Sequence, residues 1–144
     1  MNSIEITSLL GCFHRGLFPC GSRITCKPPV LDTDEDWMVL VDITNILNVG
    51  AQLLSKGFEL GGSVCINADT LESPQQFWSY TRGDLNILIT SCPDFYHRFW
   101  IATQAATKLN LLDKTDRVTL FQAILYLNVD RECDIDVSTR GDRE

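Results

Sequence analysis

Long apolar runs are missing from this 144-residue chain, and no stretch approaches the roughly 20 residues that a membrane-spanning helix needs. Its first residues, Met1–Glu5, carry neither a basic segment nor a long apolar one, so they do not match a secretory signal. We therefore expect a cytoplasmic protein with no membrane partner. Basic charge is also scarce, because 12 Lys and Arg stand against 19 Asp and Glu, which gives a net charge of −7. Since phosphate backbones repel an acidic protein, broad nucleic-acid binding is not expected, although a local basic patch could bind one nucleotide.

Cysteine and histidine patterns that bind metals are absent as well. The six cysteines form no C-x-x-C pair and no Cys/His cluster with zinc spacing, and a cytoplasmic location disfavours disulfides. We therefore expect reduced thiols, several of them small buried apolar groups. His14 and His97 lie far apart and neither has a ligand partner at helical spacing, so we expect neither to bind a metal.

The composition that remains is that of an ordinary globular protein, with 44% hydrophobic and 22% charged residues. Apolar segments bounded by turn residues predict strands over 17–20, 37–41, 63–67, 77–80 and 84–89. Apolar residues at helical spacing predict helices within 3–13 and 43–56, after Pro93 and after Asp113. These elements predict an α/β (α+β) fold in which helices flank a small, mixed, twisted sheet.

The length and the charge distribution predict one domain followed by a tail. Residues 1–129 are expected to form a single domain. Residues 130–144 are rich in charge and poor in apolar side chains, so we expect a flexible C-terminal tail.

Polar residues stand beside three of the predicted strands in a fixed order. Gly21-Ser22-Arg23 follows the first strand, Asp34 and Asp36 precede the strand 37–41, and Asp84 opens the strand 84–89. Side chains two residues apart in a strand face the same way, so Asp34 and Asp36 would lie together. Two carboxylates at such a short distance repel each other, and they are tolerated when they are exposed or when a divalent cation such as Mg²⁺ lies between them.

The other two features complete a site for phosphate chemistry. A Gly-Ser turn after a strand offers backbone N–H groups, a hydroxyl and close approach to a phosphate. A third carboxylate on a neighbouring strand, here Asp84, could complete the metal site or take a proton from an acceptor hydroxyl. Arg23 directly follows the turn and is the basic residue that we expect to reach a phosphate.

This ordered set resembles the pattern of the polymerase-beta-like nucleotidyltransferase superfamily. That pattern is a strand ending in G-S, often G-S-R, then S/T-D-x-D before an apolar strand, then a third Asp on a later strand. Here Gly21-Ser22-Arg23 is followed by Thr33-Asp34-Glu35-Asp36. The second half of the chain, from Arg82 to Val118, resembles small nucleotidyltransferase-like proteins encoded by bacteriophages.

The resemblance implies an enzyme that moves a nucleoside monophosphate from a nucleoside triphosphate to an acceptor hydroxyl. Mg²⁺ or Mn²⁺ would be held by Asp34 and Asp36, the phosphates by Gly21-Ser22-Arg23, and Asp84 would activate the acceptor. The acceptor is open, and a host protein is one candidate. The alternative is a weak or inactive nucleotidyltransferase-like phage protein that binds a nucleotide or a host protein in the host cytoplasm.

The identity of the third carboxylate stays open between two positions. Asn86 faces the same way as Asp84 in a strand, so only one of them can lie beside Asp34 and Asp36. Asp84 is preferred, because the turn at Gly83 could let the strand begin before its apolar run. If Asn86 takes the place instead, the site has no evident base and transfer should be slow or absent.

Two further assignments follow from position in the sequence. Asp32-Thr33-Asp34 is a second D-x-D, but it lies farther from the apolar strand, so Asp34 and Asp36 are preferred. Lys108, Lys114 and Arg117 surround the turn between the last two helices and could hold a triphosphate, but a solvated basic face is the preferred explanation.

Overall fold

The computed structural model describes residues 1–11, 13–30, 34–61 and 77–127. Its centre is a five-stranded mixed sheet with the strand order β1-β2-β5-β4-β3. The strands are β1 (His14–Cys20), β2 (Glu35–Val41), β3 (Glu59–Leu60), β4 (Trp78–Arg82) and β5 (Leu85–Thr90). β2 and β5 run parallel, whereas β1–β2, β4–β5 and β3–β4 are antiparallel pairs. The predicted α+β fold with a mixed sheet and flanking helices is confirmed.

The two strands predicted to carry the acidic residues are neighbours, as expected. In their parallel register Asp36 aligns with Asn86, and Met38 aligns with Leu88. Alternation then divides β2 between the two faces of the sheet. Trp37 and Val39 enter one core cluster, whereas Met38 enters the other, so Asp36 lies on the same face as Met38.

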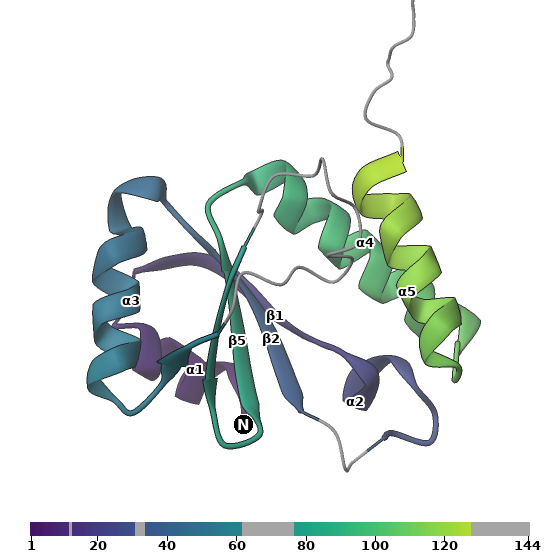
Figure 1. Cartoon of the computed structure of the whole chain (residues 1–144), viewed down its shortest axis with the longest axis horizontal. Helices are drawn as coiled ribbons and strands as arrows, with labels where there is room; N and C mark the ends of the chain where they lie inside the picture. The colour runs from purple at the N-terminus through teal and green to yellow at the C-terminus, as the bar shows by residue number, and fades with distance from the viewer. Residues whose placement is uncertain (12, 31–33, 62–76, 128–144) are drawn as a thin grey trace, which may run out of the picture.

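Helices cover both faces of the sheet (Figure 1). α1 (Ser3–Leu10) and α3 (Ile46–Ser55) pack on one face, where Ile6, Leu10, Val49 and Leu53 are fully buried. α4 (Pro93–Leu109) and α5 (Lys114–Gln122) cover the other face with an aromatic core. The remaining elements are α2 (Ser22–Thr25), the 3₁₀ turn η1 (Ile43–Asn45) and the π-helical turn η2 (Ala123–Leu127).

Local sequence signals explain where the helices on the site face begin and end. Pro93 is the first residue of α4, where its missing N–H costs nothing. Cys92 is the N-cap, with its Sγ accepting a hydrogen bond from the N–H of Phe95. Asn110 ends the helix in the left-handed region at φ 50°. Asp113 caps α5 as predicted, because its carboxylate accepts from the N–H of Thr115.

Some expectations fall on residues that the structure does not describe. The predicted strand 63–67 and the predicted tail 130–144 lie outside the described residues, and the single domain 1–129 stays a prediction. None of the helices in the described ranges has the length and apolar character that a membrane span requires.

Candidate functional site

A pocket of about 400 Å³ opens on the face of the sheet that α4 and α5 cover, beside the first residues of β2 and β5. Its polar lining comes from the strand ends and the start of α2, and includes Gly21, Ser22, Asp36, Ser79 and Asn86. Its basic lining residues are Lys114 and Arg117 of α5. Its apolar wall includes Cys20, Phe77, Leu88, Phe99, Val118 and Phe121. The pocket thus joins a polar, acidic floor to basic and aromatic walls.

Asp36 is the carboxylate of this floor, and two neighbouring strands hold it. Asn86 donates through Nδ2 to Asp36 Oδ1 at 3.0 Å, and Ser79 donates through Oγ to Asn86 Oδ1 at 2.6 Å. Burial raises the pKa of Asp36 to about 6. The Asn86 hydrogen bond and the charge of Arg23 oppose this shift, whereas the negative charge of Asp34 adds to it. Asp34 is therefore close enough to act on Asp36, although it is itself exposed.

Gly21 lies directly against Asp36, because Cys20 at the end of β1 pairs with Asp36 on β2. The backbone of Gly21 has φ 81°, which favours glycine. A Cβ at this position would also overlap the carboxylate of Asp36. The Gly-Ser turn predicted from the sequence is therefore the element that brings the backbone close to the acidic floor.

The structure reverses the preferred order of Asp84 and Asn86, because Asn86 is the residue beside Asp36. β4 and β5 form a two-residue hairpin between Arg82 and Leu85, and Asp84 occupies its turn together with Gly83, which has φ 62°. The strand therefore begins one residue later than predicted. A Gly-Asp pair between two apolar segments is a hairpin signal, and it could have placed Asp84 in the turn.

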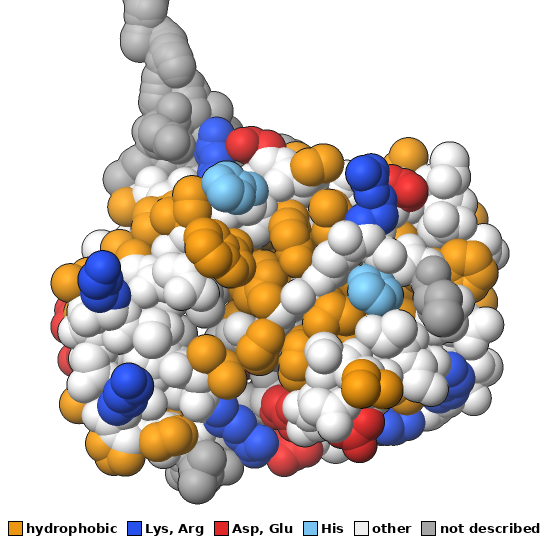
Figure 2. All heavy atoms as spheres, turned by 180° about the vertical axis from the view of Figure 1, so that it is seen from behind, with side chains coloured by type: hydrophobic (Ala, Val, Ile, Leu, Met, Phe, Trp, Pro, Cys, Tyr) orange, Lys and Arg blue, Asp and Glu red, His pale blue; other side chains and the backbone are white. Residues whose placement is uncertain are grey.

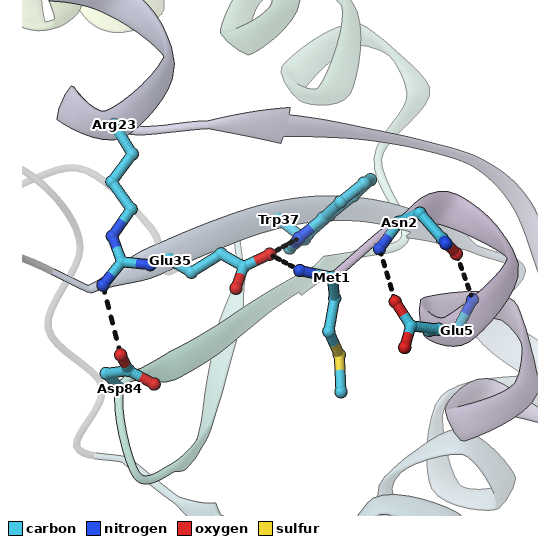
Figure 3. A network of polar contacts seen from close by, with 7 residues as sticks. All are labelled: Met1, Asn2, Glu5, Arg23, Glu35, Trp37 and Asp84. Carbon is cyan, nitrogen blue, oxygen red and sulfur yellow. Dashed lines mark hydrogen bonds and ion pairs between the residues drawn. The ribbon is translucent and has the colours of Figure 1, made fainter. Parts of the chain in front are cut away.

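Asp84 instead makes an ion pair with Arg23, whose Nη2 lies 3.1 Å from its Oδ2 (Figure 3). Gly21 and Ser22 line the pocket, whereas Arg23 does not, and their predicted role in binding phosphates stays a prediction. Arg23 thus extends from α2 to the hairpin turn, and the sequence-based role of Arg23 as a phosphate ligand stays a prediction.

Glu35 lies in the same network, one residue before Asp36. It accepts hydrogen bonds from the α-ammonium group of Met1 at 2.7 Å and from Trp37 Nε1 at 3.1 Å (Figure 3). Burial acts to raise the pKa of Glu35, but these two hydrogen bonds, together with the positive charges of the Met1 α-ammonium group and Arg23, hold the pKa below its ordinary value. The side chain of Glu35 is thus occupied on the face of β2 opposite to Asp36.

The donors near Asp36 fit a hard divalent cation. Within the described ranges no three His, Cys, Asp or Glu side chains are grouped to hold a metal ion. The available donors are the carboxylates of Asp34 and Asp36, because Asn86 turns its Nδ2 group toward Asp36 while its Oδ1 accepts from Ser79. Carboxylate oxygens suit Mg²⁺ or Mn²⁺ rather than a thiolate-seeking metal.

Lys114 and Arg117 form the basic wall of the pocket, where the sequence predicts a solvated basic face. Arg117 Nη1 donates to the carbonyl oxygens of Leu111 and Leu112, each at 2.9 Å, and lies 3.4 Å from Cys26 Sγ. These contacts hold the guanidinium group at the pocket. The signal was present in the sequence, because Lys114 and Arg117 share the helical spacing of the apolar residues of α5 that face the sheet.

Comparisons with known proteins give one correction. No family model matches the chain, and no curated protein matches it. Among solved structures, the chain is similar to the conserved protein GrpB from Enterococcus faecalis, with 12% identity over 85% of this chain and 87% of that chain and a TM-score of 0.47. The match is thus to GrpB, and the assignment from sequence to the polymerase-beta-like nucleotidyltransferase superfamily and its small bacteriophage-encoded members is wrong.

Proposed function

We propose that this protein binds a nucleoside triphosphate together with Mg²⁺ or Mn²⁺ in the pocket, and that it transfers the nucleotidyl group slowly or not at all. One observation carries the proposal: a single pocket combines the carboxylate of Asp36 and the Gly21-Ser22 turn with the cations Lys114 and Arg117. A ligand that suits this combination carries several negative charges at one end and an apolar or aromatic body at the other.

Each part of the pocket has a role in this proposal. Asp36 holds the cation from the floor of the pocket together with Asp34, which does not line the pocket but acts on Asp36 through its charge; the cation when bound neutralises phosphate charge. Lys114 and Arg117 approach the phosphates from α5, where opposite charges attract. The backbone of Gly21 and the hydroxyl of Ser22 lie where phosphate oxygens can approach closely, since no side chain at Gly21 intervenes.

Asn86 is the reason that we assign binding rather than efficient transfer. It lies beside Asp36, where a third carboxylate would complete a base for an acceptor hydroxyl. An amide cannot accept that proton at neutral pH. Positioning and charge neutralisation remain, and they support binding without rapid chemistry.

Titration calorimetry with ATP in the presence and in the absence of Mg²⁺ tests the binding site. We expect binding that depends on Mg²⁺, and a loss of at least about tenfold in affinity for Asp34→Ala and Asp36→Ala, since each removes a charged metal ligand. Asp42→Ala is the matched control, because Asp42 is exposed and pairs with Arg15 at 3.0 Å. Equal binding by all three variants, or binding unaffected by chelation of the cation, would contradict the proposal.

Nucleotidyl transfer is the second candidate function, and the contact between Asn86 and Asp36 favours it as a latent activity. Asn86→Asp changes one amide to a carboxylate at 3.0 Å from Asp36 and supplies the missing base. We expect this variant to release pyrophosphate from ATP at least about tenfold faster than the natural protein, with a protein or another hydroxyl compound as acceptor. Asp84→Asn is the control and should leave the rate unchanged, because Asp84 pairs with Arg23 in the hairpin turn. If Asp84→Asn lowers the rate and Asn86→Asp has no effect, the assignment of the two positions is wrong.

A further inference from the structure

The segment that follows α2 and the turn between α4 and α5 lie side by side, and one side chain joins them (Figure 1). Asn110 accepts a hydrogen bond through Oδ1 from the backbone N–H of Lys27 at 2.8 Å. Its Nδ2 donates to the carbonyl oxygen of Lys27 at 3.2 Å. A single amide thus makes two reciprocal hydrogen bonds between segments that are far apart in the sequence, and we call this contact the Lys27–Asn110 clip.

The clip connects two opposite parts of the pocket lining, although neither Lys27 nor Asn110 lines the pocket. On the side of Lys27, the lining residues belong to the turn after β1 and to α2. These are Gly21, Ser22 and Thr25. On the side of Asn110, the lining residues are the two cations of α5, Lys114 and Arg117. The clip therefore ties the chain just after the glycine turn to the chain just before the basic wall.

Arg117 continues this connection into the pocket. Its Nη1 lies 2.9 Å from the carbonyl oxygens of Leu111 and Leu112, and 3.4 Å from Cys26 Sγ. The thiol of Cys26 is 1% exposed and donates to the carbonyl oxygen of Leu111 at 3.5 Å. The guanidinium group of a pocket residue is thus held by the same turn that the clip fixes, so a displacement of the turn also displaces this charge.

Hydrogen bonds rather than burial hold this turn in place. All residues of the segment 112–116 are exposed, so little apolar surface fixes the first turn of α5. Positive charge is also sparse, because 12 Lys and Arg stand against 19 Asp and Glu. On the face shown in Figure 2, Lys and Arg side chains are scattered around an apolar centre rather than gathered at one place. The positive charge of the pocket therefore depends on the placement of α5.

We propose that Asn110 is a positioning residue, which through the clip holds the two cations of α5 at a fixed distance from the Gly21-Ser22 turn. This inference rests on the proposed function, since it names the part of the fold that sets the geometry of that site. Charges that are already in place attract the phosphates without a cost of ordering. When the clip is lost, the ligand must order the turn as it binds, and its apparent affinity falls.

The substitution Asn110→Gly removes the clip and keeps the end of α4. Asn110 lies in the left-handed region at φ 50°, which glycine adopts freely, so only the two side-chain hydrogen bonds are lost. The first measurement is the rate at which N-ethylmaleimide modifies Cys26, followed by mass spectrometry of the peptide that contains it. We expect modification at least about tenfold faster than in the natural protein, because a loosened turn uncovers the thiol. An unchanged rate overturns the proposal that the clip holds the turn.

The second measurement is calorimetric titration with ATP and Mg²⁺. We expect Asn110→Gly to bind about three- to tenfold more weakly than the natural protein. Asn2→Gly is the matched control, because Asn2 also bonds the backbone at a helix end, where its Oδ1 accepts from the N–H of Glu5 at 3.0 Å. It caps α1, which packs on the face of the sheet opposite to the pocket, so both measurements should stay unchanged.

The two measurements separate this inference from the proposed function. Modification of Cys26 needs no nucleotide, so it decides whether the clip holds the turn whether or not ATP binds. Equal ATP affinity of the natural protein and Asn110→Gly overturns the positioning role alone, and an equal loss in Asn2→Gly does the same. A natural protein that binds no ATP overturns the proposed function, and the positioning role with it.

Discussion

At the scale of single residues, Asp36 is a carboxylate that the fold holds partly out of water. It accepts a hydrogen bond from Asn86, but burial outweighs that contact and raises the pKa of Asp36 from 3.8 to about 6. Carboxylates that lie in a pocket and have a shifted pKa are typical of binding and catalytic sites, because their charge interacts with a ligand rather than stabilising the fold. The stability of the protein should therefore improve when this charge is removed.

The substitution Asp36→Asn tests whether the buried charge of Asp36 destabilises the folded protein. The folded protein holds the extra proton between about pH 4 and pH 6, so the free energy of unfolding of the natural protein should fall as the pH rises through this window. The amide that the substitution introduces keeps an acceptor for Asn86 and carries no charge. We expect the variant to be more stable at pH 7 by about 2 kcal/mol, and the difference to vanish by about pH 3, where Asp36 is protonated in both the folded and the unfolded protein.

Urea unfolding at several pH values between about 3 and 7 measures this difference. Asp42→Asn is the control, because it breaks an exposed ion pair with Arg15 and should change stability by less than about 1 kcal/mol. An Asp36→Asn variant that is less stable than the natural protein at pH 7 would show that the carboxylate stabilises the fold.

The site residues differ in how far sequence could identify them. The sequence points to Asp36 and Gly21, which the structure places in one pocket, because an acidic pair before an apolar strand and a glycine after a strand are local signals. The sequence alone does not separate Asp84 from Asn86, because both stand at the start of the same apolar run. A shift of one residue in the predicted start of the strand decides which of the two lies beside Asp36. Lys114 is exposed, as expected for a solvated basic face, and its helical spacing with the apolar residues of α5 is the sequence signal that it also borders the pocket.

At the scale of elements, the turn from β1 into α2 is the feature on which the site depends. Gly21 has φ 81°, and a Cβ there would overlap the carboxylate of Asp36. The turn and the acidic floor therefore fit together only with glycine at this position. Gly83 offers a comparison, since it has φ 62° and no atom lies within 4 Å of the position of its Cβ.

Gly21→Ala and Gly83→Ala compare two glycines of positive φ, of which only Gly21 lies against Asp36. Gly21 has φ 81° and ψ 178°, a backbone conformation that only glycine readily adopts, so alanine there costs about 1–3 kcal/mol in backbone strain alone. Gly21→Ala also forces Asp36 to move, so we expect it to destabilise the protein by about 1–3 kcal/mol more than Gly83→Ala and to weaken ligand binding. Equal losses in thermal or urea unfolding would mean that Asp36 moves aside without cost.

Elements with strong periodicity were predicted well, and short ones were not. The helix expected within 43–56 is α3, because its buried apolar residues repeat at helical spacing. The four-residue helix α2 was not predicted, since one turn has too few residues to show a period. β1 begins at His14, earlier than the expected strand 17–20, because its first residues pair with the far end of β2 through an irregular register that no local pattern shows.

At the scale of the whole molecule, two separate cores lie on the two faces of one sheet. The core under α1 and α3 is aliphatic apart from Trp37, Phe58 and Tyr80, whereas the core under α4 and α5 is rich in phenylalanine. The pocket opens on the second core, so its aromatic wall belongs to the packing that holds α4 and α5 on the sheet. The site is therefore attached to a rigid layer, while the first core supports the sheet from behind.

If the proposed function is right, the overall charge of the chain limits the phosphate ligand to a small one. Two cations, Lys114 and Arg117, meet in the pocket, and that number suits the phosphates of one nucleotide. A nucleic-acid polymer that binds through its backbone at physiological salt engages about 6–10 phosphates, which a chain with a net charge of −7 would repel outside the pocket. Three arginines outside the pocket lining are already paired with carboxylates, namely Arg15 with Asp42, Arg23 with Asp84 and Arg98 with Asp94.

Fluorescence anisotropy of a labelled single-stranded oligonucleotide of about 20 residues, in RNA and DNA form, tests this expectation. At about 150 mM salt we expect no change in anisotropy up to about 100 µM protein, while a labelled ATP analogue with Mg²⁺ binds under the same conditions. Lys114→Glu should abolish binding of the analogue and leave the oligonucleotide result unchanged, because it reverses one of the two charges that line the pocket. Oligonucleotide binding that weakens steeply with added salt would instead reveal a basic surface extending beyond Lys114 and Arg117, and the ligand would then be a polymer rather than a single nucleotide.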